Sequence, residues 1–304
     1  VRRGQSHLPG KGPLLTEGSR STERTDGTGF ISGQTRLAAV IGDPVRHSRS
    51  PLIHNAAFAA LGLDWVYLAF PVAAGNADRA LDAMRTLSID GLSVTMPHKQ
   101  QVAESVDEAT AETRALGACN CVVRDGDKLV GHNTDGAGFV AAVEAETGRG
   151  LGGTSVGVIG AGGAARAIVF ALGQAGASDV VVVNRTTSAG QSAAELTPVA
   201  RVGGHADLEE VDVVINATSV GMVGGPDPTG MPHEPALIRA GQIVADIVYQ
   251  PLETAWMAAA RQQGATVVGG LGMLVHQAAL AFELWTGRRP PIDVMTQAVS
   301  GELG

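Results

Sequence analysis

The chain has 304 residues, a formal net charge of −8 at pH 7 and an apolar fraction of 44%. This length allows two domains with their own cores, while the negative charge and the lack of a basic stripe argue against nucleic acid as a partner. No apolar window approaches the length of a membrane span, so we also expect no insertion into a membrane.

The two cysteines indicate a reducing compartment. Cys119 and Cys121 lie two residues apart in one predicted strand, which is too close for a disulfide framework. We therefore expect a cytoplasmic protein. A zinc site would need further ligands at suitable spacing, and none is evident, so we predict no metal.

The first 36 residues differ in composition from the rest of the chain. They are rich in Gly, Ser, Thr and Arg and show little apolar periodicity. We predict a disordered tail at residues 1–36, and this tail lacks the apolar core of a secretory signal.

From Leu37 onward, strands and helices alternate. Ser50 is expected to cap a helix whose first turn contains Pro51. In this first half, strands are predicted at 37–42, 65–70, 91–95, 118–124 and 128–131, and helices at 51–61, 77–87, 100–106, 109–116 and up to about 147.

The second half is organised around the stretch from Thr154 to Thr186. It contains an apolar strand at 156–159, a glycine turn, a helix and a second apolar strand at 180–183, which is one βαβ unit of a parallel sheet. Beyond it we predict strands at 211–216, 243–247 and 266–268, and helices at 188–196, 252–263, 270–285 and 293–303.

The glycine turn has the spacing of a dinucleotide site. Gly160 permits the tight turn out of the strand, Gly162 leaves room for a pyrophosphate, and Ala165 allows close packing of helix on strand. The free N–H groups at the start of the helix favour an anion. This pattern, placed between a strand and a helix, predicts a bound dinucleotide.

The end of the second strand indicates which dinucleotide is bound. An NAD site has Asp or Glu there, whereas this chain has Asn184, Arg185 and Thr186. Because an arginine attracts a 2′-phosphate, we predict NADP. The alternative is that Arg185 is an ordinary surface residue.

Polar residues follow several strands, at the places where ligands collect in a doubly wound sheet. Their hydroxyls, amides and a possible lysine–carboxylate pair suit a small polyhydroxylated acid. Oxidation of an alcohol needs a hydride acceptor and a proton acceptor, and Lys99, Asp135 or the coupled pair are candidates for the second role. The polar positions are Ser48, Ser50, Thr95, Lys99, Asn120, Asp135 and Gln277.

Each of these residues also has an ordinary structural interpretation. Lys99 could be solvated surface, Asp135 could cap the next helix, and Gln277 could lie on a helix flank. The two serines could be loop and cap residues. The histidines have no convincing metal spacing, and we interpret His47, His54, His98 and His132 as structural or surface residues.

Taken together, the chain resembles the shikimate dehydrogenase family from about Leu37 to its C-terminus. The matching stretches keep the family order, and their joint occurrence is highly specific. They are 41–51, 94–99, 117–120, 133–136, 160–164, 184–186, 215–219 and 270–278.

The resemblance implies an α/β fold with an N-terminal substrate-binding domain at 37–135, a Rossmann-type NADP domain at 136–271, and C-terminal helices at 272–304 that return to the first domain. It implies NADPH-dependent, reversible reduction of 3-dehydroshikimate to shikimate in the biosynthesis of chorismate and aromatic amino acids. It implies Lys99 and Asp135 as the catalytic pair.

The resemblance also implies the binding residues. The substrate pocket would be formed by Ser48, Ser50, Thr95, Lys99, Asn120, Asp135, Tyr249 and Gln277. The cofactor would be held by Gly160, Ala161, Gly162, Gly163, Ala164, Asn184, Arg185 and Thr186, with Ile247 and Gly270 near the nicotinamide.

Three positions depart from the family pattern. The family often has Asn at the position of Ser93 and Thr at the position of Cys121. It often has a second basic residue at the position of Ala189, and the lack of that residue weakens the expected preference for NADP.

Two alternative functions are open. One is a dehydrogenase for quinate or an amino analogue, and the other, from another class, is a non-catalytic NADP-binding sensor module. We expect a monomer or homodimer.

Overall fold

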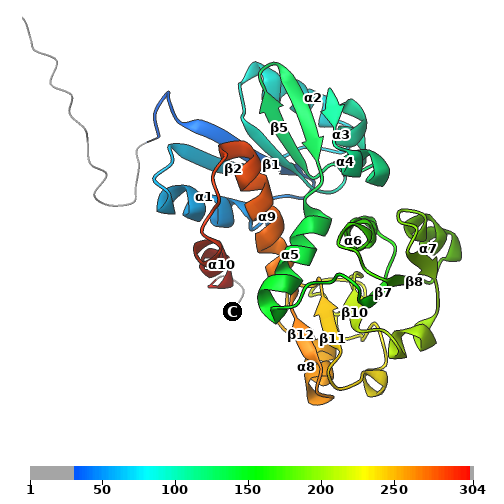
Figure 1. Cartoon of the computed structure of the whole chain (residues 1–304). Helices are drawn as coiled ribbons and strands as arrows, with labels where there is room; N and C mark the ends of the chain where they lie inside the picture. Colours follow the sequence, from blue (N-terminus) through cyan, green and yellow to red (C-terminus); the bar gives the residue numbers. More distant parts are fainter. Residues whose placement is uncertain (1–30, 302–304) are drawn as a thin grey trace, which may run out of the picture. The chain divides into compact units, whose positions relative to one another are not determined.

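The computed structural model of the chain describes residues 31–301 (Figure 1). Most of the predicted tail at 1–36 and the predicted end of the last helix at 302–303 therefore lie outside the described residues. The first strand already includes Arg36, so regular structure begins one residue earlier than we predicted.

The first half of the chain forms a six-stranded mixed sheet in the order β2-β1-β3-β5-β6-β4. β1 runs parallel to β2 and β3, whereas β5 is antiparallel to β3 and β6. Its strands are β1 (Arg36–Gly42), β2 (Trp65–Pro71), β3 (Gly91–Val94), β4 (Glu108–Ala109), β5 (Cys121–Asp125) and β6 (Lys128–His132). Its helices are α1 (Ser50–Ala60), α2 (Ala77–Thr86), α3 (Lys99–Ser105) and α4 (Ala111–Leu116).

The second half forms a six-stranded parallel sheet in the order β12-β11-β10-β7-β8-β9. Its strands are β7 (Ser155–Ile159), β8 (Asp179–Val183), β9 (Ala200–Val202), β10 (Val213–Asn216), β11 (Ile243–Asp246) and β12 (Thr266–Val268). Its helices are α6 (Gly163–Gln174), α7 (Thr187–Ala194), η1 (His205–Glu209), η2 (Pro235–Leu237) and α8 (Ala255–Gln262). The strand order reverses between β7 and β10, and in such sheets ligands bind at that switch point.

The last helices return to the first sheet, as we predicted. Helix α9 (Gly270–Thr286) follows the second sheet, yet its residues Phe282 and Trp285 belong to the core that contains Val40 of β1. The indole nitrogen of Trp285 donates to the carbonyl of Val122 in β5 at 3.0 Å. Helix α10 (Ile292–Ser300) packs on α1 (Figure 1).

Several local predictions need correction. Helix α1 starts at Ser50, so Arg49 occupies the cap position and no side chain caps it; Ser50 is not the cap. Strand β5 begins at Cys121 instead of 118. The short strands β4 and β9 carry too few residues to show a two-residue alternation, and the sequence did not predict them.

Helix α5 (Asp135–Thr147) links the two sheets and packs on both α6 and α9 (Figure 1). Glycines allow these close contacts. A Cβ built on Gly136 would overlap the carbonyl oxygen of Ala167 in α6 and lie 2.8 Å from the Cβ of Ala171. A Cβ on Gly138 would lie 2.7 Å from the Cα of Gln277 in α9.

We expect Gly136→Ala to destabilise the fold by about 1–3 kcal/mol, although alanine is the better helix former, because the new methyl group meets fixed backbone. Gly190→Ala in α7 is the control: its Cβ would meet nothing closer than 3.7 Å, so no loss is expected. Urea unfolding of both variants measures the difference. Equal midpoints for Gly136→Ala and the wild type would contradict the packing argument.

Candidate active site

A cavity of about 390 Å³ collects residues from both halves of the chain. It is bordered by the ends of β1 and β3, the starts of α1, α3 and α5, the loop after β11 and helix α9. The predicted residues that line it are Ser48, Ser50, Thr95, Lys99, Asn120, Asp135, Ile247, Tyr249, Gly270 and Gln277. Thus the structure brings the whole predicted substrate set together.

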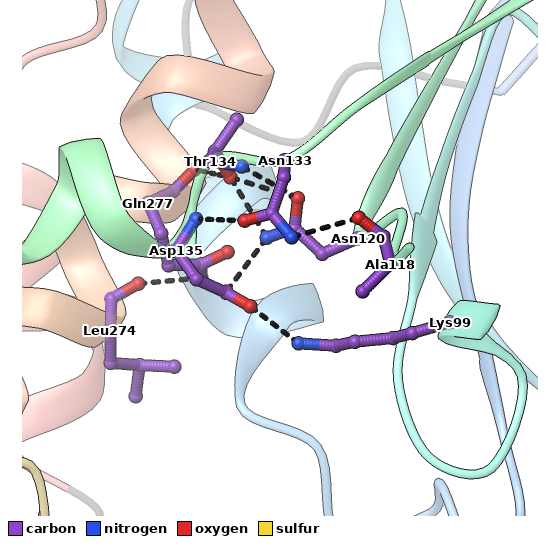
Figure 2. Close-up of polar contacts among 8 residues, drawn as sticks. All are labelled: Lys99, Ala118, Asn120, Asn133, Thr134, Asp135, Leu274 and Gln277. Carbon is purple, nitrogen blue, oxygen red and sulfur yellow. Dashed lines mark hydrogen bonds and ion pairs between the residues drawn. The ribbon is translucent and has the colours of Figure 1, made fainter. Parts of the chain in front are cut away.

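Lys99 and Asp135 form an ion pair inside this cavity. The Nζ of Lys99 lies 2.6 Å from Oδ2 of Asp135, and the side chains are 29% and 12% exposed (Figure 2). Each residue is the first of a helix, Lys99 in α3 and Asp135 in α5. Neither structural alternative applies: Lys99 is not free surface, and Asp135 does not occupy the cap of α5, which is Thr134.

Asn120 holds the other oxygen of the carboxylate. Its Nδ2 donates to Oδ1 of Asp135 at 2.8 Å and lies 2.9 Å from Oγ1 of Thr134 (Figure 2). Asn133 supports the same turn, since its Oδ1 accepts from the backbone N–H of Asp135 and its Nδ2 donates to the carbonyl of Ala118. No role for Asn133 or Thr134 was predicted from the sequence, although both stand in the matching stretch 133–136.

The loop before α1 and the first residue of α1 each contribute one serine hydroxyl to the cavity. The backbone N–H of Ser50 donates to Oγ of Ser48 at 3.3 Å, at the N-terminal end of α1. Thr95 follows β3, and its N–H donates to the carbonyl of Ile41. These groups are neutral donors near a helix N-terminus, a suitable environment for a carboxylate.

Helix α9 contributes Gln277 to the wall of the cavity. Its Nε2 donates to the carbonyl of Leu274 at 2.8 Å, and its own backbone carbonyl accepts from Oγ1 of Thr134 (Figure 2). Met273 and Leu274, which the sequence analysis did not single out, give this wall apolar surface.

The glycine turn lies outside this cavity, after β7 and at the start of α6. Gly160 has a φ of 118°, and its Cβ would lie 2.8 Å from the carbonyl oxygen of Ala217, so only glycine fits there. A Cβ on Gly162 would meet nothing within 4 Å. The turn is therefore open on the side where α6 presents its N–H groups, and a pyrophosphate fits that place.

The residues after β8 also lie outside the cavity. Nδ2 of Asn184 donates to the carbonyl of Thr186, which stabilises the turn, while the side chain of Arg185 is exposed. Helix α7 begins directly after this turn. An exposed cation beside a helix start fits a phosphate ester.

A buried polar network supports the loop that carries Ile247 and Tyr249. Asp246 accepts from Nδ2 of Asn216 and from the backbone N–H of Val248 on one oxygen, and from Oγ1 of Thr254 on the other. Burial raises the pKa of Asp246 above its usual range. The sequence matched 215–219 to the family pattern but gave no reason for its polar residues.

Two of the histidines, His54 and His98, are buried in the fold. His98 is buried, with Nε2 2.7 Å from the carbonyl of Val72, and His54 stacks on Tyr67 at a centroid distance of 4.3 Å. Burial lowers the pKa of His54 to about 3, so its ring is neutral. In the described part of the chain, no three His, Cys, Asp or Glu side chains are grouped so that they could hold a metal.

Within residues 31–301, no helix combines the length and the apolar character that crossing a membrane requires.

The carboxyl group of Glu112 in α4 interacts electrostatically with Asp135. It lines a second groove, between α4, α5 and α6, together with the exposed Glu144. Burial raises the pKa of the Glu112 carboxyl to about 7, and the negative charge of Asp135 adds to this shift.

Three family descriptions match successive parts of the chain. Residues 40–122 match the shikimate dehydrogenase substrate binding domain, residues 142–222 match shikimate / quinate 5-dehydrogenase, and residues 270–299 match the shikimate 5′-dehydrogenase C-terminal domain.

Individual proteins are similar over almost the whole chain. A curated shikimate dehydrogenase (NADP(+)) of Moorella thermoacetica is 41% identical over 285 residues, which cover 90% of this chain and 96% of that protein. The Listeria monocytogenes shikimate 5-dehydrogenase in complex with shikimate and NAD has a TM-score of 0.84 and 34% identity, covering 90% of this chain and 99% of the other. The Thermus thermophilus shikimate 5-dehydrogenase in complex with NADP(H) and shikimate has a TM-score of 0.81 and 36% identity, covering 88% and 99%.

We expect Glu112→Gln to stabilise the protein above pH 7. A carboxyl group whose pKa is raised in the folded state destabilises that state increasingly as the pH rises from the unfolded value of 4.5 to about 7, and constantly above it. The gain should be about 1 kcal/mol at pH 8, below the full linkage value because the side chain is only half-buried.

Urea unfolding at pH 5, 6, 7 and 8 measures this effect. Glu144→Gln is the matched control, because its side chain is exposed on the same groove, and no pH-dependent gain is expected there. A gain for Glu112→Gln that is the same at pH 5 and pH 8 would rule out the linkage.

Proposed function

The chain belongs to the shikimate dehydrogenase family, and from this premise we infer that it catalyses the reversible, NADP(H)-dependent interconversion of 3-dehydroshikimate and shikimate. The observation that carries the assignment is the Lys99–Asp135 pair in a cavity that also gathers the predicted hydroxyl and amide groups. We propose that this reaction serves chorismate and aromatic amino-acid biosynthesis in the cytoplasm.

We propose that Lys99 and Asp135 handle the proton of the reacting hydroxyl group. In the reducing direction, the Lys99 ammonium gives a proton to the carbonyl oxygen as the alcohol forms; in the oxidising direction, the pair takes the proton back. Asp135 orients the Lys99 ammonium by the 2.6 Å ion pair and compensates its positive charge. The bound NADP(H) supplies the hydride donor or acceptor.

The neutral groups hold the substrate. Ser48 and Ser50 bind the carboxylate beside the start of α1, where the helix macrodipole favours an anion. Thr95, Tyr249 and Gln277 line the cavity and bind the ring hydroxyls, since hydroxyl and amide groups can both donate and accept. Asn120 uses both amide protons on Thr134 and Asp135, so it binds a ring hydroxyl as an acceptor, through its amide oxygen. Ser93 also lines this cavity, and a serine there reaches less far than the Asn common in the family.

The cofactor is bound by the glycine turn and the residues after β8. Gly160 to Ala164 would hold the pyrophosphate, and Asn184, Arg185 and Thr186 would hold the 2′-phosphate. Ile247 and Gly270 line the cavity, which supports their proposed place beside the nicotinamide. Because Ala189 provides no second cation, Arg185 alone supplies the positive charge on this turn.

Residues 37–135 with 272–304, and residues 136–271, are proposed as the two domains. The core that joins β1, α1, α9 and α10 supports the return of the C-terminal helices to the first domain. Both proposed boundaries fall at the first turns of α5 and α9, the two helices that connect the sheets. A monomer or homodimer stays a prediction.

The four combinations of shikimate or quinate with NADP⁺ or NAD⁺ test the substrate and the cofactor. We expect reduction of the nicotinamide to be fastest with shikimate and NADP⁺, because Arg185 favours the 2′-phosphate. Absorbance of the reduced nicotinamide measures each rate. Preference for quinate would identify a sister activity, and a folded protein that binds NADPH but reduces nothing would favour the sensor alternative.

Lys99→Ala tests the acid–base role. Because general acid–base groups contribute about 10²- to 10⁴-fold, we expect kcat to fall by at least about 100-fold while NADPH affinity is kept. The control is Lys128→Ala, which removes another lysine–carboxylate pair, with Glu108, on the exposed surface. Steady-state rates and NADPH fluorescence titration give both readouts; unchanged kcat in Lys99→Ala would disprove the role.

A further inference from the structure

We propose that Thr134 is a positioning residue, whose buried hydroxyl joins Asn120 to helix α9 and so sets the geometry of the proton-transfer pair. This inference rests on the function proposed above and adds a residue to which that proposal gives no role. It concerns the junction between β6 and α5 (Figure 2).

The hydrogen bonds of Thr134 determine the orientation of the Asn120 amide. The backbone N–H of Thr134 can only donate, and it lies 2.8 Å from one amide atom of Asn120, so that atom is the oxygen. The other amide atom is then Nδ2, which reaches both Oγ1 of Thr134 at 2.9 Å and Oδ1 of Asp135 at 2.8 Å. Both protons of this amide are therefore used.

The single hydroxyl proton of Thr134 points to α9. Oγ1 donates to the backbone carbonyl of Gln277 at 3.0 Å, whereas its distance to Oδ1 of Asn120 is longer, 3.3 Å. The hydroxyl thus accepts from Asn120 and donates to Gln277, which uses its one proton and one lone pair. Three segments that are distant in the sequence meet at this oxygen atom.

Burial and close backbone packing make this junction rigid. Thr134 is only 4% exposed, so water does not substitute easily for its partners. Gly138, one turn further along α5, brings the backbones of α5 and α9 into contact at Gln277, as the 2.7 Å approach of a Cβ there shows. A displacement of α9 is consequently transmitted through Thr134 to Asn120 and then to Asp135.

The position of Thr134 in its helix supports a role beyond folding. It is the cap residue of α5, where a threonine side chain ordinarily accepts a hydrogen bond from the first turn and stabilises the helix by about 1 kcal/mol. Here the side chain makes no such bond. Its hydroxyl is used for Asn120 and Gln277 instead, and the helix start goes without this stabilisation.

The test compares Thr134→Val, which keeps the shape and removes the hydroxyl, with Thr134→Ser, which keeps the hydroxyl. Because a displacement of reacting groups by about 1 Å can lower a rate 100-fold, we expect kcat for shikimate oxidation to fall about 10- to 100-fold in Thr134→Val. The KM for shikimate should rise several-fold, and the KM for NADP⁺ should stay within about twofold. Thr134→Ser should recover most of the lost turnover.

Thr113→Val is the matched control. Thr113 is fully buried in α4, and its hydroxyl donates to the carbonyl of Gly131 at 3.2 Å, away from the cavity. This variant should lose thermal stability but keep the kinetic constants. If Thr134→Val does not fold, Thr134→Ala is measured in its place, because it removes the same hydroxyl group without a branched side chain.

The outcomes separate the two proposals. Wild-type kcat in a folded Thr134→Val or Thr134→Ala variant would overturn the positioning role and leave the proposed function intact. The same holds if Thr134→Ser loses as much turnover as Thr134→Val, since the hydroxyl would then not be the cause. A wild-type protein that turns over no shikimate overturns the proposed function, and this inference with it.

Discussion

The buried negative charge of Asp135 constrains the rest of the site. A carboxylate that is 12% exposed needs partners in place of water, and it has three. The Lys99 ammonium contacts one oxygen, the Asn120 amide contacts the other, and the N-terminal end of α5 adds a favourable dipole. These partners come from α3, from the residue before β5 and from α5. The first sheet must therefore be assembled before this charge is compensated.

The topology of the two sheets explains why so many polar groups share one cavity. Parallel strands direct their carboxyl ends to the same edge, so Thr95 after β3 and the serines after β1 lie together. The second sheet contributes the loop after β11. Buried hydrogen bonds of Asp246 with Asn216 and with the backbone N–H of Val248 stabilise this loop. Helix α9 then carries Gln277 from the second sheet back to the first. The Lys99–Asp135 pair, the predicted substrate residues, Ile247 and Gly270 thereby line one cavity of about 390 Å³.

Helix α5 connects the two sheets and packs closely on α6 and α9. It has glycines on two faces, and they let it approach α6 at Gly136 and α9 at Gly138 with backbone in contact. Close-packed interfaces of this kind have little freedom to adjust. Because Asp135 is the first residue of the same helix, the location of its carboxylate depends on both sheets. Thr134, the cap residue of this helix, adds hydrogen bonds to Asn120 and to the backbone carbonyl of Gln277.

Local sequence patterns were sufficient for the βαβ unit, the glycine turn and the order of most strands and helices, because apolar periodicity and glycine chemistry act over a few neighbouring residues. The candidate substrate residues followed from polar side chains after strands and from the family resemblance. The strands β4 and β9, and the roles of Thr134 and Asp246, were decided by tertiary structure alone. Their partners, such as Gln277 for Thr134, are far away in the chain, and a hydrogen bond between distant residues leaves no periodic signal in either segment.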